Sequence, residues 1–168
     1  YQFSTSKAFV LKGDKPFTLG HYSLGEQEVT PPADKTIYTE GFQTVKGCTQ
    51  DVGHTNLGDP ALAVAVPWAQ YRDDYAFLVP DTYRYDFVTL LFPAGAVGPD
   101  VILDNKVQDL TFHKVGSTGL SYARMRISDG PQKIKSSHKF GIEVYGYDCN
   151  VSYAYSGGNN LKPINPIK

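Results

Sequence analysis

Apolar and polar residues alternate along much of this chain, and a period of two residues is typical of β-strands. The alternation is clearest in residues 140–158, FGIEVYGYDCNVSYAYSGG, which contain two strand-like runs. Gly146, Asp148 and Asn150 lie between these runs and are residue types that tolerate turns. The stretch therefore predicts a β-hairpin with Cys149 at its tip.

Shorter runs of the same kind recur along the chain, each bounded by residues that favour turns. Residues 8–11 and 17–22 flank the turn KGDKP and predict a first hairpin. Further strands are predicted at residues 36–45, 62–66, 76–79, 83–92, 101–107 and 121–127. The run at 62–66 is predicted to be a buried strand, because it is apolar throughout. The run at 101–107 predicts a tight hairpin around Asp104-Asn105.

One helical turn and about ten to twelve strands are predicted in all. The helical turn is indicated by Trp68, Tyr71 and Tyr75, which follow a proline at helical spacing. Short strands that recur every 8 to 12 residues or so favour a sandwich or barrel. No repeat or linker divides the chain, so we expect a single all-β domain over residues 1–168, a jelly-roll-like β-sandwich. Residues 159–168 lack an apolar period and are expected to form an irregular exit segment.

Composition agrees with this fold and argues against several partners. The 168 residues include 12 tyrosines, 16 glycines and 11 prolines but one methionine, a bias toward strands joined by turns. A net charge of −1, from 16 basic and 17 acidic residues, gives no global field for nucleic acid or an anionic membrane. No apolar run reaches the roughly 18 residues of a membrane helix. The first residues, YQFSTSKAF, are unlike a signal peptide and suggest a piece of a longer chain.

The two cysteines, Cys48 and Cys149, lie far apart in the sequence and lack the spacing of zinc ligands. In an exported protein we expect them to form a disulfide. In the chain-entropy model a loop of that length contributes about 4 kcal/mol to stability. The alternative is a pair of buried free thiols in a cytosolic protein.

Motifs for metal binding and catalysis are missing from the sequence. Asp51, His54, Asn56 and Asp59 form the densest group of potential calcium ligands, but their spacing is not that of a calcium loop, and we expect no metal or cofactor. The sequence contains no nucleophile, phosphate-binding or zinc-protease motif. These observations indicate a protein that is not an enzyme.

Aromatic residues carry the functional content of the sequence. A buried phenol needs a hydrogen-bond partner, so some of the 12 tyrosines are expected on the surface, where they could contact sugar rings or a protein. Trp68, with Tyr71 and Arg72 beside it, is the best candidate for an exposed binding group, and Tyr83 and Tyr85 are further candidates. The alternative is that these rings line the core of a sandwich and its rim.

Three segments in order resemble the bacterial members of a family named for an IgG Fc-binding protein. The first, Gly58 to Ala96, is similar to the family's "GDP, apolar strand, P" run and the aromatic segment after it. The second, VILDNKV, resembles its "L-D-G" turn, with Asn105 in place of the glycine. The third is the hairpin at 140–158, in which Ser156 replaces a proline. The sequence also has Gln132 where a histidine often occurs in the family.

The resemblance implies an exported all-β domain of large surface or mucus proteins that is used for recognition or adhesion. Binding of IgG itself does not follow from the family name, because fold and compartment transfer between relatives better than the ligand does. We therefore expect a secreted or cell-surface module that binds a glycan or a cell-surface protein. Two alternatives are an assembly domain at the tip of an oligomeric fibre, such as a trimer, and a hydrolase of polysaccharides.

Overall fold

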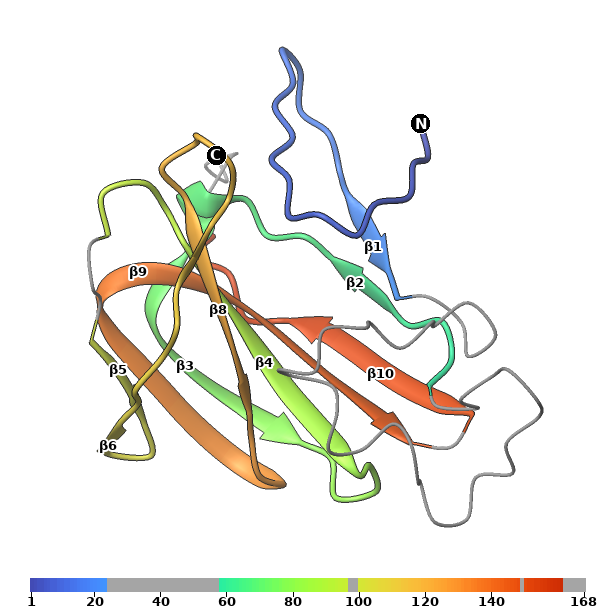
Figure 1. Ribbon diagram of the computed structural model, residues 1–168, viewed down its shortest axis with the longest axis vertical. Coiled ribbons are helices and arrows are strands. Elements are labelled where there is room, and N and C mark those ends of the chain that lie inside the picture. The colour runs from blue at the N-terminus through green and yellow to red at the C-terminus, as the bar shows by residue number, and fades with distance from the viewer. Residues whose placement is uncertain (24–57, 97–99, 149, 162–168) are drawn as a thin grey trace, which may run out of the picture.

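The computed structural model describes residues 1–23, 58–96, 100–148 and 150–161, and this part of the chain is all-β (Figure 1). It contains one 3-10 turn, η1, at Trp68–Gln70 and ten strands: β1 Gly20–Tyr22, β2 Leu62–Val64, β3 Arg72–Val79, β4 Tyr85–Phe92, β5 Val101–Leu103, β6 Lys106–Val107, β7 His113–Lys114, β8 Ser121–Arg126, β9 Gly130–Asp148 and β10 Val151–Ser156. The prediction of an all-β chain is confirmed, and the predicted helical turn is found as η1.

The long strand β9 belongs to two antiparallel sheets. Its first half pairs with β3 on one side and with β5, followed by β6, on the other. Its second half pairs with β10 and with β4, which is followed by β8 and β7. Figure 1 shows how β9 bends between the two halves, so that the sheets curl toward each other. This arrangement is consistent with the predicted β-sandwich.

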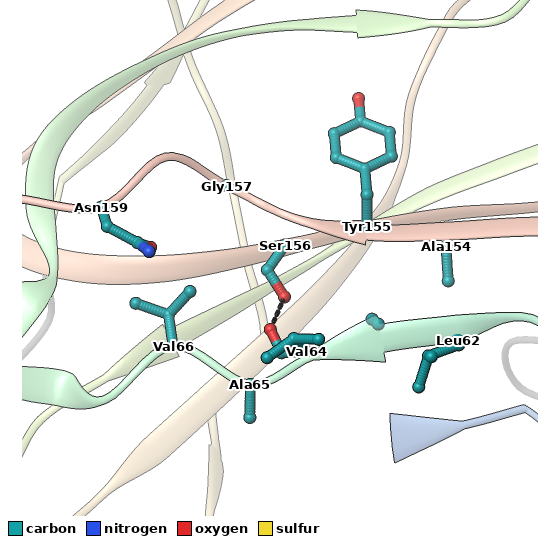
Figure 2. Close-up of a pocket in the computed structure, with 10 residues that line it drawn as sticks. Leu62, Val64, Ala65, Val66, Ala154, Tyr155, Ser156, Gly157 and Asn159 are labelled. Atoms are coloured by element: carbon teal, nitrogen blue, oxygen red, sulfur yellow. Dashed lines mark hydrogen bonds between the residues drawn. The ribbon is translucent and has the colours of Figure 1, made fainter. Parts of the chain in front are cut away.

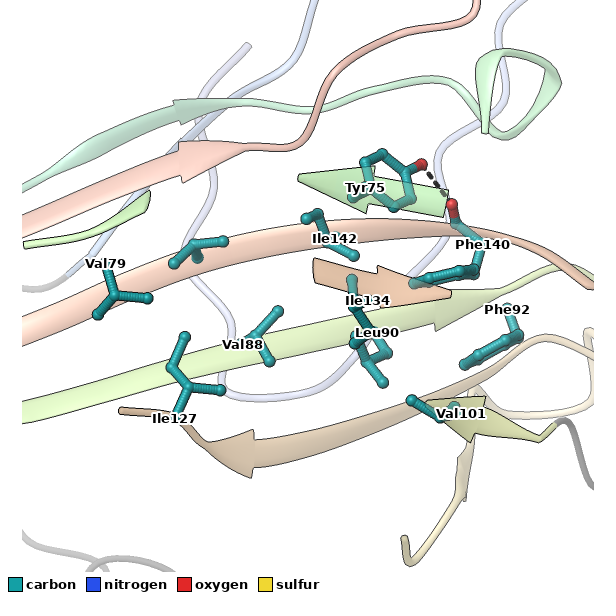
Figure 3. Packing of buried hydrophobic residues seen from close by; sticks show 11 residues of the cluster. Tyr75, Val79, Val88, Leu90, Phe92, Val101, Ile127, Ile134, Phe140 and Ile142 are labelled. Atoms are coloured by element: carbon teal, nitrogen blue, oxygen red, sulfur yellow. Dashed lines mark hydrogen bonds between the residues drawn. The ribbon is translucent and has the colours of Figure 1, made fainter. Parts of the chain in front are cut away.

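The core lies between the two sheets and is built from the alternation that the sequence shows. On β9 the side chains of Ile134, Phe140, Ile142 and Val144 are almost completely buried. Figure 3 shows how they pack with apolar residues of the other strands, namely Tyr75, Val79, Val88, Leu90, Phe92, Val101 and Ile127. The rings of Phe92 and Phe140 stack with their centroids 5.3 Å apart. Truncating such a ring to alanine typically costs about 3–5 kcal/mol, so this stack holds the sheets together.

A small two-stranded sheet, β1 with β2, lies outside this core. The structure contradicts the predicted first hairpin, because Gly20–Tyr22 pairs with Leu62–Val64 and not with residues 8–11. Residues 8–11 form no strand; Phe9 and Leu11 remain exposed, so pairing there would bury little apolar surface to offset the ordering of the backbone.

The strand predicted at 62–66 is shorter than expected and is not buried throughout, as the prediction required. β2 covers only Leu62–Val64, and Leu62 and Val64 are 47% and 52% exposed. Ala63 between them is buried. A two-stranded sheet that packs through one face buries only every second residue, which explains the difference.

Two predicted hairpins are confirmed. β9 and β10 are joined by a two-residue connection, with Val151 opposite Asp148. β5 and β6 are joined by Asp104 and Asn105, whose φ angles of 46° and 66° are those of a type I′ turn. Residues 157–161 contain no strand, whereas the predicted strand at 36–45 and residues 162–168 lie outside the described residues.

Candidate functional site

Trp68 is held at the surface by the 3-10 turn η1. The turn is closed by two backbone hydrogen bonds: the N–H of Gln70 donates to the carbonyl of Pro67 at 2.8 Å, and the N–H of Tyr71 donates to that of Trp68 at 3.1 Å. Proline fixes φ at about −65° just before the turn, which restricts the backbone from which the indole projects. Trp68 is 50% exposed, so the prediction that it lies at the surface is confirmed.

Tyr71 does not join Trp68 at the surface. It is only 8% exposed, and its ring lies against the backbone of Gly141 on β9, where any side chain would collide with it. Burial raises the pKa of Tyr71 to about 12, with smaller contributions from Tyr75 and Glu143. The prediction of an exposed Tyr71 is therefore wrong: the ring anchors η1 to the sheet.

Arg72 begins β3 and is partly buried. Its side chain turns along the strand to Asp74, donating from one terminal nitrogen to Oδ1 at 3.1 Å and from Nε to the backbone carbonyl at 3.2 Å. The guanidinium is thus paired within β3 and not with Trp68.

Tyr83 and Tyr85 lie near the opposite end of the sheet and are partly buried. The ring of Tyr83 meets Tyr153 edge-on at 4.6 Å, and the guanidinium of Arg126 lies 5.1 Å from the centre of the Tyr85 ring. Tyr71 covers Gly141. The residue of β4 that pairs with Gly141 lies six positions after Tyr85 in the same strand. At about 3.4 Å per residue the two regions are roughly 20 Å apart, so the five predicted residues do not form one site.

A cleft lies between β2 and β10 in the described part of the chain, and one of its walls ends at Val66, two residues before Trp68 (Figure 2). Its volume is about 290 Å³, at the lower end of the range for small ligands. Its walls are residues 62–66 on one side, and Ala154, Tyr155, Ser156, Gly157 and Asn159 on the other. In Figure 2 the side chains of Ala154 and Ser156 point toward β2, whereas the Tyr155 ring points away.

Hydrogen bonds hold the two walls in place. The hydroxyl of Ser156 donates to the carbonyl of Val64 across the cleft at 2.6 Å. The backbone N–H of Asn160 donates to the carbonyl of Gln70 at 2.9 Å, which fastens the chain after β10 to η1. Trp68 therefore lies between two attachment points: Val64, which is bonded to Ser156, and Gln70, which is bonded to Asn160.

The side chains that line the cleft are mostly apolar or uncharged polar groups. None of the ten lining residues is an acid, a base or a histidine, and the hydroxyl of Tyr155 donates to the carbonyl of Leu78 in another direction. A polysaccharide hydrolase would need two carboxyl groups facing one groove. The cleft offers apolar surface, backbone polar groups and the Ser156 hydroxyl, which suit a ring or a side chain held by contact.

A buried acid lies at the far end of the sheet, where sequence reasoning did not predict a role. Asp86 on β4 is 3% exposed, and its Oδ1 accepts a hydrogen bond from the hydroxyl of Tyr153 at 2.6 Å. Burial raises the pKa of Asp86, and Asp129 raises it further, whereas the Tyr153 bond lowers it. Burial and the bond to Asp86 raise the pKa of Tyr153. The Tyr153 ring packs against the core, so the pair lies at its edge.

An ion pair joins the small sheet to the large one. Nδ1 of His21 on β1 lies 2.9 Å from Oε1 of Glu143 on β9. This bond raises the pKa of His21, although partial burial and the charge of Arg124 lower it. When His21 is protonated, the pair fixes β1 and β2 against the sheet that carries β10.

Several predicted residues are not tested by this structure. Cys48, Cys149 and the loop residues Asp51, His54 and Asn56 lie outside the described residues. Asp59 is exposed, and its backbone N–H donates to the hydroxyl of Ser152 at 2.8 Å. In the described ranges no three His, Cys, Asp or Glu residues are grouped as metal ligands. No helix in those ranges is long and apolar enough to span a membrane.

Comparison with known proteins agrees with the resemblance seen in the sequence. The family model described as IgGFc binding protein matches residues 1–146, which is most of the chain. The chain belongs to the IgG Fc-binding protein family. No curated protein and no solved structure matches it. The family is one of extracellular domains, and it suggests a binding function.

Proposed function

We propose that this domain is a recognition module of a secreted or surface protein, and that it binds a glycan or a cell-surface protein at the cleft between β2 and β10. The observation that carries the proposal is the half-exposed Trp68, two residues along the chain from the wall of a cleft, in a family of binding domains. A tryptophan face provides a large apolar contact with little loss of conformational entropy, for a sugar ring or for a protein.

The geometry suits a small, partly apolar group. The Ser156 hydroxyl donates its hydrogen to Val64 and the Gly157 N–H donates to Ile142, so the Ser156 oxygen and the Gly157 carbonyl are left to accept hydrogen bonds from hydroxyl or amide groups of a ligand. The exposed apolar side chains of Leu62 and Val64 form part of one wall of the cleft. A ligand could therefore place one group in the cleft and rest on Trp68.

The test is a glycan array together with binding to intact cells, comparing the wild type with Trp68→Ala. We expect at least tenfold weaker binding for the variant, because residues of this kind commonly contribute 2 kcal/mol or more, roughly 30-fold, to an interface. Phe17→Ala is the matched control, since Phe17 is 55% exposed on the N-terminal segment. Equal binding by the wild type and Trp68→Ala, or no binding by either, would remove Trp68 and the cleft from the function.

A second candidate function, assembly into an oligomer, is supported by the N-terminal segment. Several large apolar residues there are substantially exposed, namely Tyr1, Phe3, Phe9, Leu11, Phe17 and Tyr22. Such surface is often covered by a partner. A closed oligomer, for example a trimer at a fibre tip, would bury it between copies. The mass by light scattering tests this candidate, and a monomer at all concentrations would contradict it.

A further inference from the structure

The outer face of the other sheet carries a row of lysines on β9. Lys133, Lys135, Ser137 and Lys139 are all exposed, whereas Gln132 and Ile134 are buried. Successive residues of a strand point to opposite faces, so the exposed side chains form one line along the strand. At about 3.3 Å per residue, Lys133 and Lys135 lie roughly 7 Å apart, Lys139 lies roughly 13 Å beyond Lys135, and the row extends for roughly 20 Å.

The row is not neutralised by its neighbours in the described part of the chain. No acidic side chain there forms an ion pair with any of the three ammonium groups. Asp74 lies opposite Lys135 in the strand register, but its carboxylate is bonded to Arg72 at 3.1 Å. Oδ1 of Asp104 accepts its bond from the backbone N–H of Lys133 and not from the ammonium group.

One common reason for surface lysines does not apply to Lys133 and Lys135. Lysines often protect an exposed sheet edge, but this part of β9 has β3 on one side and the β5–β6 hairpin on the other. Across the strands Lys133 faces Ala76, and Lys135 faces Ile102 and Asp74, whose carboxylate is bonded to Arg72. The whole chain has a net charge of −1, so this concentration of positive charge is local.

We propose that this face binds a linear anionic polysaccharide carrying sulfate or carboxylate groups. Lysine ammonium groups act as compact point charges and suit a chain of separate anionic groups. Exposed apolar residues border the row, with Leu78 opposite Pro131 and Val107 opposite Ile102. They offer surface to the apolar face of a sugar ring. Among the described residues, those that share this face with the lysines on β3 and β9 include no aromatic side chain for base stacking, which favours a polysaccharide over single-stranded nucleic acid.

The test is retention of the protein on immobilised heparin, with polygalacturonate as the carboxylated probe and dextran as the neutral one. We expect the wild type to bind at low ionic strength and to elute as salt rises, because exposed charges are screened. The triple variant Lys133→Glu, Lys135→Glu, Lys139→Glu should bind at least tenfold more weakly. If heparin binds and polygalacturonate does not, sulfate is the group recognised; the reverse result assigns carboxylate.

The N-terminal segment provides a control with the same change of net charge. Lys7, Lys12 and Lys15 are exposed, and their triple replacement by glutamate should leave retention unchanged. Equal loss in both triple variants, no retention of the wild type, or equal competition by an oligonucleotide would overturn the proposal. Circular dichroism checks folding, and a triple lysine-to-glutamine variant replaces any variant that does not fold. Trp68→Ala should bind heparin normally, so this surface and the cleft are tested separately.

Discussion

Replacing Gly141 by alanine tests whether the contact between β9 and Tyr71 fixes the segment that carries Trp68. A Cβ atom at Gly141 would lie 2.5 Å from Cζ and 2.9 Å from the hydroxyl oxygen of Tyr71. Both glycine and ring are buried, so the ring has to move outward or β9 has to shift.

Two opposing effects set how much Gly141→Ala changes the free energy of unfolding. The backbone at Gly141 does not have a positive φ, so alanine fits it and should stabilise the fold by about 0.4–1 kcal/mol through the unfolded state. Overpacking a well-packed region typically costs about 1–3 kcal/mol. The collision is with a ring held against backbone, and we therefore expect a net destabilisation of about 1–2 kcal/mol. For a chain of this length the Tm should fall by about 2–8 °C.

A second substitution isolates the cause. The atoms that collide belong to the outer part of the Tyr71 ring, which Tyr71→Leu removes. In that background Gly141→Ala should become stabilising by about 0.4–1 kcal/mol, because only the effect on the unfolded chain remains. Gly158→Ala is the matched control: nothing lies within 4 Å of a Cβ there, and the position is exposed.

The assay is urea unfolding of the four proteins of this cycle, followed by far-ultraviolet circular dichroism. A cost of Gly141→Ala that stays the same in the Tyr71→Leu background would refute the proposed contact. A fall in stability of the Gly158→Ala control would show that replacing a glycine in this region destabilises the fold for another reason.

Two further predictions concern the ionisable pairs. Tyr153→Phe removes the donor to buried Asp86 and should cost about 1.5–3 kcal/mol in urea unfolding at neutral pH. The folded pKa of Asp86 is raised from its usual 3.8. The stability that Asp86 contributes is therefore complete below pH 3.8 and lost as pH rises through the raised pKa. Asp86→Asn should remove this decline, and an unchanged dependence of stability on pH would contradict the assignment. The pKa of His21 is raised from 6.5 mainly by Glu143, so the stability from this pair is complete below 6.5 and lost as pH rises through the raised value. Glu143→Gln should lower the His21 pKa in a proton NMR titration, and no change would show that the pair is absent in solution.

Local elements were predictable because their causes are local. The turn at Asp104-Asn105 and the hairpin of β9 and β10 follow from turn residues flanked by alternating runs, and both are found. Pairing between distant segments was not predictable in this way. β1 joins β2 about 40 residues later, and the cleft brings Val64 to Ser156. No short-range pattern specifies either contact, because each depends on how the sheets curl.

The environment of single aromatic residues was only partly predictable. Trp68 and Tyr71 have similar sequence surroundings, yet one is half-exposed and the other is buried. The residue that decides is Gly141, which leaves room for the Tyr71 ring and lies 70 residues away in the sequence. A glycine inside an alternating strand is a signal for such a close approach. It does not say which residue fills the space.

The glycines of the β9–β10 hairpin show what the family pattern specifies. Gly141 is in contact with Tyr71, and a side chain at Gly146 would collide with Tyr153 and with the Asp86 carboxylate. Each glycine therefore admits a particular neighbour from another strand. The most recognisable part of the sequence is thus explained by packing, without any reference to a ligand.

Gly157 follows the same rule. Its N–H donates to the carbonyl of Ile142 at 2.8 Å, and a side chain there would collide with Ile142 and with Tyr75.

Residues that determine packing are shared by domains of one architecture whatever they bind. The ligand should accordingly be determined by residues that the packing does not require. In this chain, Trp68 and the lysines of β9 are exposed, and none of them fills the core. Substituting them should change binding while leaving the free energy of unfolding within about 0.5 kcal/mol of the wild type.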